Sequence, residues 1–168
     1  MISMVAVDDN WGIGLNGDLP WHIPGEQVFF REKTIGNTIV MGRKTLESLP
    51  GGKPLKGRRN IILTRNPDFS CDGAKVVFNP EELLNAIHGL DSDKVFLIGG
   101  AQIYRLLLPY CKKAYVTKVD GCFKVDSHHP NLDCDSDWRV ADISEEIVST
   151  GISYKRYFYE NIFLVGNS

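Results

Sequence analysis

Residues 36–65 read GNTIVMGRKTLESLPGGKPLKGRRNIILTR, and two strand-like runs in this stretch decide the fold. The first run, 38–41, leads into Gly42-Arg43-Lys44-Thr45, and the second, 60–63, leads into Thr64-Arg65. A strand that stops at a glycine and opens a helix points free backbone N–H groups and the positive end of the helix dipole outward, which suits a phosphate. One basic residue at such a place is usually an ordinary solvated charge. Two such strand ends together predict a site for a phosphorylated ligand.

Strand-like and helix-like runs alternate along the rest of the chain. Apolar, β-rich runs predict strands over 2–7, 38–41, 60–63, 75–78 and 94–98, and then strands alone over 114–119, 139–147 and 153–163. Amphipathic runs predict helices over 25–34, 44–49, 80–88 and 101–108, the third with Asn79 as N-cap and Pro80 in its first position. This order predicts an α/β fold, a mainly parallel sheet with an antiparallel C-terminal edge.

The composition is that of one globular domain. The chain has 168 residues, 43% apolar and 24% charged, so we expect a single domain over 1–163 and a short tail over 164–168. The net charge of -2 argues against binding nucleic acid by phosphate neutralisation. No apolar run approaches the roughly 20 residues that span a bilayer, and residues 1–4 begin a strand at once, so we expect a cytoplasmic protein without membrane contact. Four dispersed cysteines predict free thiols, and a monomer is the default.

In such a sheet the ligand cleft lies at the carboxyl ends of the strands. The loops of interest are therefore 8–21, 42–45, 64–67, 99–102 and 117–120. Gly99-Gly100 follows a predicted strand and precedes a helix, where a backbone approaches a ligand closely or adopts angles that favour glycine. A glycine pair alone is more often a tight turn. Its place among the other loops makes it a candidate ligand contact.

Glu26 is the candidate for proton transfer. It stands in the first turn of a predicted helix whose Phe29 and Phe30 must face the core. Desolvation beside an apolar cleft disfavours the charged form of a carboxylate, which adapts it to proton transfer near neutrality. The alternative is an ordinary acidic residue placed favourably at a helix N-terminus.

Four ordered motifs make the chain similar to bacterial dihydrofolate reductases along nearly its whole length. LPWHIP (19–24) resembles the start of the family's catalytic helix, IVMGRKTLES (39–48) its cofactor strand and helix, GRRNIILTR (57–65) the next strand, and FLIGGAQIY (96–104) its glycine pair. WGIGLNGDLPW (11–21) further resembles the mobile loop that closes over nicotinamide.

The resemblance implies a fold and a reaction. The fold would be dihydrofolate-reductase-like, with a central, mainly parallel, eight-stranded sheet, an antiparallel C-terminal edge and about four flanking helices. The reaction would be hydride transfer from NADPH to C6 of 7,8-dihydrofolate with protonation at N5, which yields 5,6,7,8-tetrahydrofolate for one-carbon metabolism. Antifolate inhibitors would bind at the same site.

In this resemblance Glu26 is the active-site carboxylate, which holds the pterin through its 2-amino group and N3 and helps supply the proton by way of water. Thr117 supports that carboxylate, and Trp21 helps to hold the ordered water. Arg58 grips the α-carboxylate of the substrate's glutamate tail, since its planar fork matches a carboxylate. Phe30 packs on the pterin, Leu49 and Leu55 flank the aminobenzoyl ring, and the other implied contacts are Met4, Val5, Ala6, Gln27, Ile98 and Tyr104.

Cofactor contacts are implied mainly at three loops. Gly42 to Thr45 match the pyrophosphate contacts, and cationic groups near the adenosine 2′-phosphate favour NADPH over NADH. The glycine pair would press on the cofactor, with a cis bond between Gly99 and Gly100. The implied set is Ala6, Ile13, Gly14, Asp18, Leu19, Gly42, Arg43, Lys44, Thr45, Leu63, Thr64, Arg65, Ile98, Gly99, Gly100, Ala101, Gln102, Ile103 and Tyr104.

The chain departs from the common bacterial pattern at several positions. Gly25-Glu26-Gln27 replaces a small residue, an Asp and a Leu, and resembles the trimethoprim-insensitive reductases carried on mobile elements. Because Gln27 is polar where an apolar residue usually touches the ligand, weak trimethoprim binding is a hypothesis. Gln102 replaces an arginine and Ala101 a third glycine, and both substitutions bear on the strength of cofactor binding.

Other functions stay open. A pyrimidine reductase of riboflavin synthesis, or a related pterin reductase, uses NADPH on this fold, but the carboxylate helix and the Arg58 clamp are not expected together in it. A nucleotide-binding scaffold without activity would have no need of Glu26. His128-His129 with Asp126, Asp133 and Asp135 could suggest a metal site, but their spacing is irregular. In the resembling family the Asp126 region is a hairpin loop that steadies the mobile loop. His22 is expected to be a polar rim residue.

Overall fold

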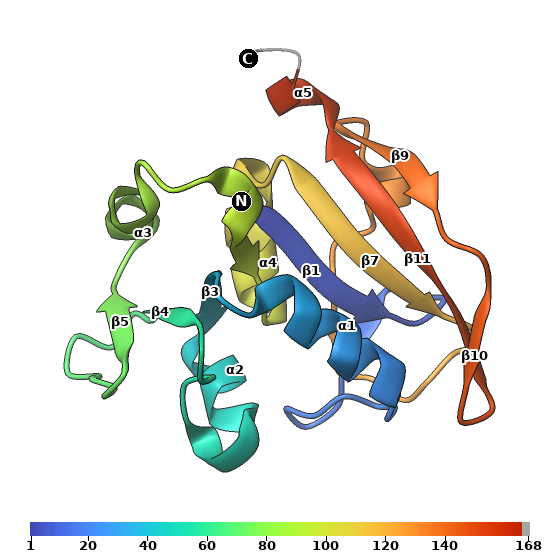
Figure 1. Ribbon diagram of the computed structural model, residues 1–168, viewed down its shortest axis with the longest axis horizontal. Helices are drawn as coiled ribbons and strands as arrows, with labels where there is room; N and C mark the ends of the chain where they lie inside the picture. The colour runs from blue at the N-terminus through green and yellow to red at the C-terminus, as the bar shows by residue number, and fades with distance from the viewer. Residues whose placement is uncertain (166–168) are drawn as a thin grey trace.

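One large sheet organises the chain, of which the computed structural model describes residues 1–165 (Figure 1). Its strands are β1 (Ile2–Val7), β3 (Thr38–Gly42), β4 (Arg59–Leu63), β5 (Ala74–Val77), β6 (Val95–Leu97), β7 (Lys113–Val119), β9 (Trp138–Ile143), β10 (Ile147–Ser149) and β11 (Ile152–Asn161). Eight strands follow the order β10-β11-β7-β1-β6-β3-β4-β5, and β9 also pairs with β11. Pairings from β7 to β5 are parallel, whereas β11 is antiparallel to its neighbours. The predicted fold class is confirmed.

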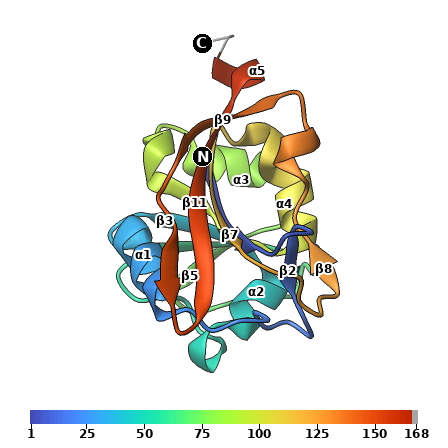
Figure 2. The ribbon, with the colours of Figure 1, turned by 90° about the vertical axis from the view of Figure 1, so that its right-hand side faces the viewer.

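Helices cover both faces of this sheet. Within residues 1–165 they are α1 (Pro24–Thr34), α2 (Arg43–Ser48), α3 (Pro80–Ile87), α4 (Ala101–Leu107) and the single turn α5 (Ile162–Val165). Short 3-10 helices occupy Pro50–Gly52, Ser92–Lys94, Leu108–Tyr110 and Leu132–Cys134, and a small second sheet pairs β2 (Gly12–Gly14) with β8 (Ser127–His128). Figure 2 shows α1 and α4 on opposite sides of the sheet. No helix in the described part of the chain is long and apolar enough to cross a membrane.

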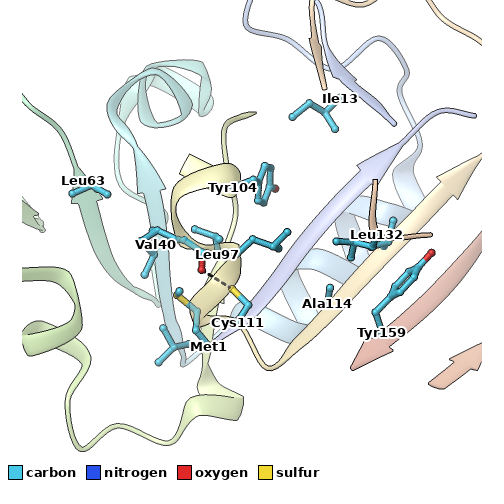
Figure 3. Close-up of a cluster of buried hydrophobic side chains, with 14 of the residues drawn as sticks. Met1, Ile13, Val40, Leu63, Leu97, Tyr104, Cys111, Ala114, Leu132 and Tyr159 are labelled. Carbon is cyan, nitrogen blue, oxygen red and sulfur yellow. Dashed lines mark hydrogen bonds between the residues drawn. The ribbon is translucent and has the colours of Figure 1, made fainter. Parts of the chain in front are cut away.

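Alternating side chains of β1 and β3 build the two apolar layers. Ile2, Met4, Ile39 and Met41 belong to the cluster beneath α1, and Val7 and Val40 to the cluster beneath α4. Period-two alternation sends successive side chains to opposite faces, so both faces of these central strands are buried. The cluster drawn in Figure 3 continues through α4, whose Tyr104 and Leu107 are 3% and 0% exposed.

The C-terminal strands differ from the prediction. The predicted strand 139–147 is wrong as one element, because β9 and β10 are separate, although both pair with β11. Ser144 lies at the break, where its hydroxyl accepts the Arg156 N–H at 2.9 Å in place of a ladder bond. The predicted strand 153–163 ends at Asn161, whose side chain accepts the Leu164 N–H in α5 at 3.2 Å. Of the predicted tail 164–168, residues 166–168 lie outside the described residues.

Candidate active site

Glu26 lies in the first turn of α1 and reaches two neighbouring strands. Its Oε2 accepts a hydrogen bond from the Thr117 hydroxyl in β7 at 2.6 Å. Its Oε1 lies 2.8 Å from both Nε and Nη2 of Arg156 in β11. The Glu26 and Arg156 side chains are 16% and 19% exposed. The structure therefore joins Glu26 to Thr117, as the resemblance implies, and adds a cation that sequence analysis does not name.

This cation changes the electrostatics expected at Glu26. The apolar residues around Glu26 in the sequence predict desolvation as the main influence on the carboxylate. A guanidinium at hydrogen-bonding distance favours the charged form and opposes desolvation. The Arg156 guanidinium also lies 4.1 Å from the centroid of the Phe29 ring, so its open face is covered by an aromatic side chain.

An apolar wall continues from Phe29 along the same side of the sheet. Five predicted substrate contacts meet in this one cluster, namely Met4, Phe30, Leu49, Leu55 and Ile98. They come from β1, from α1, from the residues after α2 and from the end of β6. An aromatic ligand beside Glu26 would therefore have apolar contacts supplied by four parts of the chain.

Arg58 is held at the far end of this wall. Its Nε donates to the Thr34 hydroxyl at 2.8 Å, and its Nη1 donates to the Lys56 carbonyl at 3.0 Å. Its guanidinium lies 5.8 Å from the Phe30 ring centroid. Burial, together with the charge of Arg31, lowers the pKa of Arg58 from its usual value without threatening its charge. The side chain is oriented before any ligand arrives.

Two predicted cofactor loops meet where β3 and β6 end. The Gly42 N–H donates to the Gly99 carbonyl at 2.9 Å. A Cβ at Gly42 would lie 2.8 Å from Ile103, and a Cβ at Gly100 would lie 3.4 Å from Thr45 Oγ1. The predicted cis bond between Gly99 and Gly100 is confirmed. Gly42 leaves room for the Ile103 side chain, and the helix starts after Gly42 and Gly100 offer backbone N–H groups, which suits a phosphate-bearing ligand.

The other predicted cofactor residues surround these loops more loosely. Arg43 pairs with Glu47 at 3.4 Å on the surface of α2, and Thr64 Oγ1 accepts the Asn66 N–H at 3.2 Å. Not all of the predicted cofactor side chains are buried at these loops. Five of them are exposed at the surface, namely Asp18, Leu19, Lys44, Arg65 and Gln102. Val5, Ile13, Leu63, Ala101 and Ile103 pack in or against the α4 cluster, and Ala6 packs with Trp21. Tyr104 is buried behind the glycine pair, where its hydroxyl donates to the Met4 carbonyl at 2.7 Å.

Residues 8–21 are tied to the hairpin region before β8. The Asn16 N–H donates to Asp126 Oδ2 at 2.9 Å, and the Asp126 N–H donates to the Gly14 carbonyl at 2.8 Å. The expected contact between the Asp126 region and this loop is confirmed. Asp8 is 2% exposed and accepts the N–H groups of Asn10, Gly12 and Phe123. Trp21 packs edge-on against Phe123, with ring centroids 5.2 Å apart.

The two histidines considered as metal ligands have different surroundings. His128 is exposed, whereas His129 is 2% exposed and packs against Tyr104 with ring centroids 4.6 Å apart. Across residues 1–165, no three or more His, Cys, Asp or Glu side chains are grouped so that they could hold a metal ion. His22 is exposed near the start of α1.

Three side chains that shape this site have no role predicted from the sequence, namely Thr34, Asp8 and Arg156. Arg156 alternates in phase with Tyr154 and Phe158 along β11, so its charge falls on the side of the strand that faces α1. A charged residue on a buried strand face needs a partner. That pattern is a signal from which the pairing could have been suspected, although not the identity of the partner.

Fold and site together define a class of protein. It is an α/β protein with a mainly parallel sheet, a carboxylate in the first turn of a helix and glycine-lined loops where two parallel strands end. The family model described as dihydrofolate reductase matches residues 1–161. The chain belongs to the dihydrofolate reductase family.

Individual relatives agree with this assignment. The chain is 43% identical over 164 residues to a dihydrofolate reductase of Mycobacterium tuberculosis, covering 95% of this chain and 97% of the relative. It is 42% identical over 141 residues to that of Bacillus subtilis, covering 83% and 81%. A solved dihydrofolate reductase from Enterococcus faecalis, complexed with NADP(H) and RAB-propyl, superposes with a TM-score of 0.85 at 34% identity, covering 95% of this chain and 94% of that one.

Proposed function

We propose that this chain reduces 7,8-dihydrofolate to 5,6,7,8-tetrahydrofolate with NADPH. The observation that carries the proposal is the Glu26 carboxylate, held by the Thr117 hydroxyl at 2.6 Å beside an apolar wall, in a member of the dihydrofolate reductase family. The bound NADPH supplies the hydride for C6 of the pterin. The chain supplies the binding surfaces and a route for the proton that N5 requires.

On the substrate side, Glu26 accepts hydrogen bonds from the pterin 2-amino group and N3 and relays a proton through water. Trp21 helps to hold that water, and Thr117 fixes the carboxylate. Phe30 packs on the pterin, and Leu49 and Leu55 enclose the aminobenzoyl ring. Arg58 receives the α-carboxylate of the glutamate tail, and it is supported there by its hydrogen bond to Thr34. The remaining contacts are Met4, Val5, Ala6, Gln27, Ile98 and Tyr104.

On the cofactor side, the bare backbone at Gly42 and Gly99-Gly100 receives the pyrophosphate and the nicotinamide half. Thr45 lies close enough to Gly100 for one ligand to touch both loops. Arg43, Thr64 and Arg65 contact the 2′-phosphate, where charge favours NADPH. Residues 13–19, tied to Asp126, cover the nicotinamide.

The monomeric state, the cytoplasmic setting and the 1–163 domain boundary stay predictions.

The direct test is to mix the protein with NADPH and dihydrofolate and follow the loss of absorbance near about 340 nm, which reports reduced nicotinamide. Rapid loss that depends on both compounds supports the proposal. If NADPH binds but dihydrofolate does not react, the substrate is another pterin or a pyrimidine. If neither binds, the proposal is wrong.

We also propose that trimethoprim binds weakly, as the resemblance of Gly25-Glu26-Gln27 suggests. Gln27 is exposed one residue after the carboxylate, and an amide there gives an apolar inhibitor ring less favourable contact than leucine. We expect Gln27→Leu to lower the trimethoprim inhibition constant about tenfold, consistent with burying one to two methylene groups. The KM for dihydrofolate, measured in parallel, is the control. Equal inhibition of both proteins would contradict the proposal.

Arg58 provides a test of the substrate's orientation. We expect Arg58→Lys to raise the KM for dihydrofolate about tenfold with little change in kcat, because lysine cannot reproduce the planar fork on a carboxylate. Steady-state kinetics at saturating NADPH measure both quantities. The control is Lys56→Met, which removes an adjacent exposed charge. A pterin substrate without the glutamate tail should show the same KM with wild type and Arg58→Lys; a persistent difference would place the tail elsewhere.

A further inference from the structure

Arg156 and Thr117 lie directly opposite each other on adjacent strands, and both reach the same carboxylate. The register of β11 and β7 pairs Arg156 with Thr117. Opposed residues on neighbouring strands project from the same face of the sheet. Thr117 binds Glu26 Oε2 at 2.6 Å, whereas Arg156 Nε and Nη2 both bind Oε1 at 2.8 Å. Each carboxylate oxygen is therefore anchored by a different strand.

The surroundings of Arg156 leave Glu26 as its anionic partner. Its side chain is 19% exposed and lies between the Phe29 ring at 4.1 Å and the Tyr154 ring at 5.6 Å. Its own backbone N–H donates to Ser144 Oγ at the break between β9 and β10, which holds β11 in register at this point. Removing a guanidinium from water is unfavourable unless an anion compensates. The geometry assigns that compensation to Glu26.

We propose that Arg156 is a positioning residue for the active-site carboxylate. It places a positive charge against the Glu26 carboxylate and fixes the plane of that group, and thereby sets the pH range in which the site delivers a proton to the pterin. This inference rests on the proposed function for its kinetic consequence. The ion pair itself is a property of the unliganded protein.

Three side chains from neighbouring strands face the Glu26 carboxylate, and they determine its electrostatic environment. They are the Arg156 guanidinium and the Tyr154 phenol from β11 and the Thr117 hydroxyl from β7. Burial, and then the negative charge of Glu26, raise the pKa of Tyr154, so the phenol stays neutral at working pH. Threonine does not titrate. Arg156 is therefore the charged group through which the strands act on Glu26.

The sign of the effect follows from this arrangement. A neighbouring cation favours the ionised form of a carboxylate over the protonated form. Replacing Arg156 with an uncharged side chain is therefore expected to move the descending limb of the rate to higher pH by about one pH unit.

The kinetic experiment compares Arg156→Met, which keeps length without charge, with Arg156→Lys, which restores charge. Single-turnover hydride transfer is measured at saturating NADPH from about pH 5 to about pH 9. We expect the Met variant to move the descending limb up by about one pH unit and the Lys variant to return most of it. Arg139→Met is the matched control, because Arg139 of β9 forms a surface ion pair with Glu160 of β11, the strand that carries Arg156. A Met profile that superposes on wild type, at an unchanged melting temperature, would overturn the proposal.

A second readout separates this proposal from the proposed function. Protein with carbon-13 at the glutamate carboxyl groups is titrated without ligands, and the Glu26 signal is assigned from its absence in Glu26→Gln. The Glu26 midpoint should rise in Arg156→Met and return toward wild type in Arg156→Lys. If wild type does not reduce dihydrofolate, the proposed function fails, and the spectroscopic midpoint still decides the role of Arg156. An unmoved midpoint overturns the inference even in an active enzyme.

Discussion

Replacing Glu26 by glutamine should lower turnover of dihydrofolate by about two to three orders of magnitude at neutral pH. The amide keeps the shape of the side chain and can still accept the Thr117 hydrogen bond. It cannot carry a proton to the pterin, and it leaves the Arg156 guanidinium without an anion at a partly buried position. The effect should fall on kcat, because the lost step is proton delivery rather than cofactor binding.

Steady-state and single-turnover rates with dihydrofolate measure this effect, and NADPH titration followed by protein fluorescence shows whether the cofactor loops are intact. Glu26→Asp is the companion variant, since it keeps the charge with one methylene fewer and should retain more activity. Glu160→Gln is the matched control, because it removes a carboxylate of β11 that pairs at the surface with Arg139 of β9. A Glu26→Gln protein within about twofold of wild type would remove Glu26 from proton transfer, whose loss normally costs at least about a hundredfold.

The predictable part of this protein consists of features encoded by neighbours in the chain. The strand over 2–7 and the Asn79 cap of α3 follow from local patterns, and the side chain of Asn79 does accept the Glu82 N–H at 2.9 Å. The meeting of the loops at Gly42 and Gly99 could be predicted, because parallel strands place their carboxyl ends at one edge of the sheet. At this level, periodicity and turn chemistry carry enough information.

The remainder depends on pairings between distant parts of the chain. Glu26 and Arg156 are separated by 130 positions, and the β7–β11 register brings Arg156 beside Thr117. No local pattern specifies that register. The break at Ser144 is similar, since its hydroxyl accepts the N–H of Arg156, which lies twelve positions further along the chain. The resemblance implied Thr117 and Arg58, whereas only the folded chain identifies Glu26 as the partner of Arg156.

The departures from the common bacterial pattern at Gly25 and Glu26 fit the packing around Arg156. A glutamate is one methylene longer than the Asp usual at this position, and here its two oxygens reach hydroxyl and guanidinium groups on separate strands. Gly25 makes room beside it, since a Cβ there would lie 2.8 Å from the Tyr154 hydroxyl. The departures at Gly25 and Glu26 therefore belong to the same local packing as Arg156, and they are best tested together.

His129 should make the stability of the protein depend on pH below neutrality. Burial lowers its pKa to about 4 from an ordinary 6.5, although the hydrogen bond with the Pro130 carbonyl opposes this shift. Below pH 6.5 this ring is protonated in the unfolded chain, whereas in the folded chain it stays neutral until about pH 4. The free energy of unfolding therefore falls as pH falls through this range. The loss is complete near pH 4 and amounts to about 3 kcal/mol, at about 1.4 kcal/mol per pH unit.

The variant His129→Phe isolates this contribution, because phenylalanine keeps a ring between Trp11 and Tyr104 but cannot titrate. Its free energy of unfolding at pH 7.5, measured with urea, should fall below that of wild type, because the ring contacts to Ser3 and Pro130 are lost. As pH approaches about 4, the free energy of unfolding of wild type should fall by about 3 kcal/mol more than that of the variant. The difference in stability between the two proteins should therefore narrow or change sign. His22→Phe changes a solvated ring and serves as the control. Parallel pH curves for wild type and His129→Phe would mean that the His129 ring gains water or a partner when it is protonated, so that its burial carries no proton linkage.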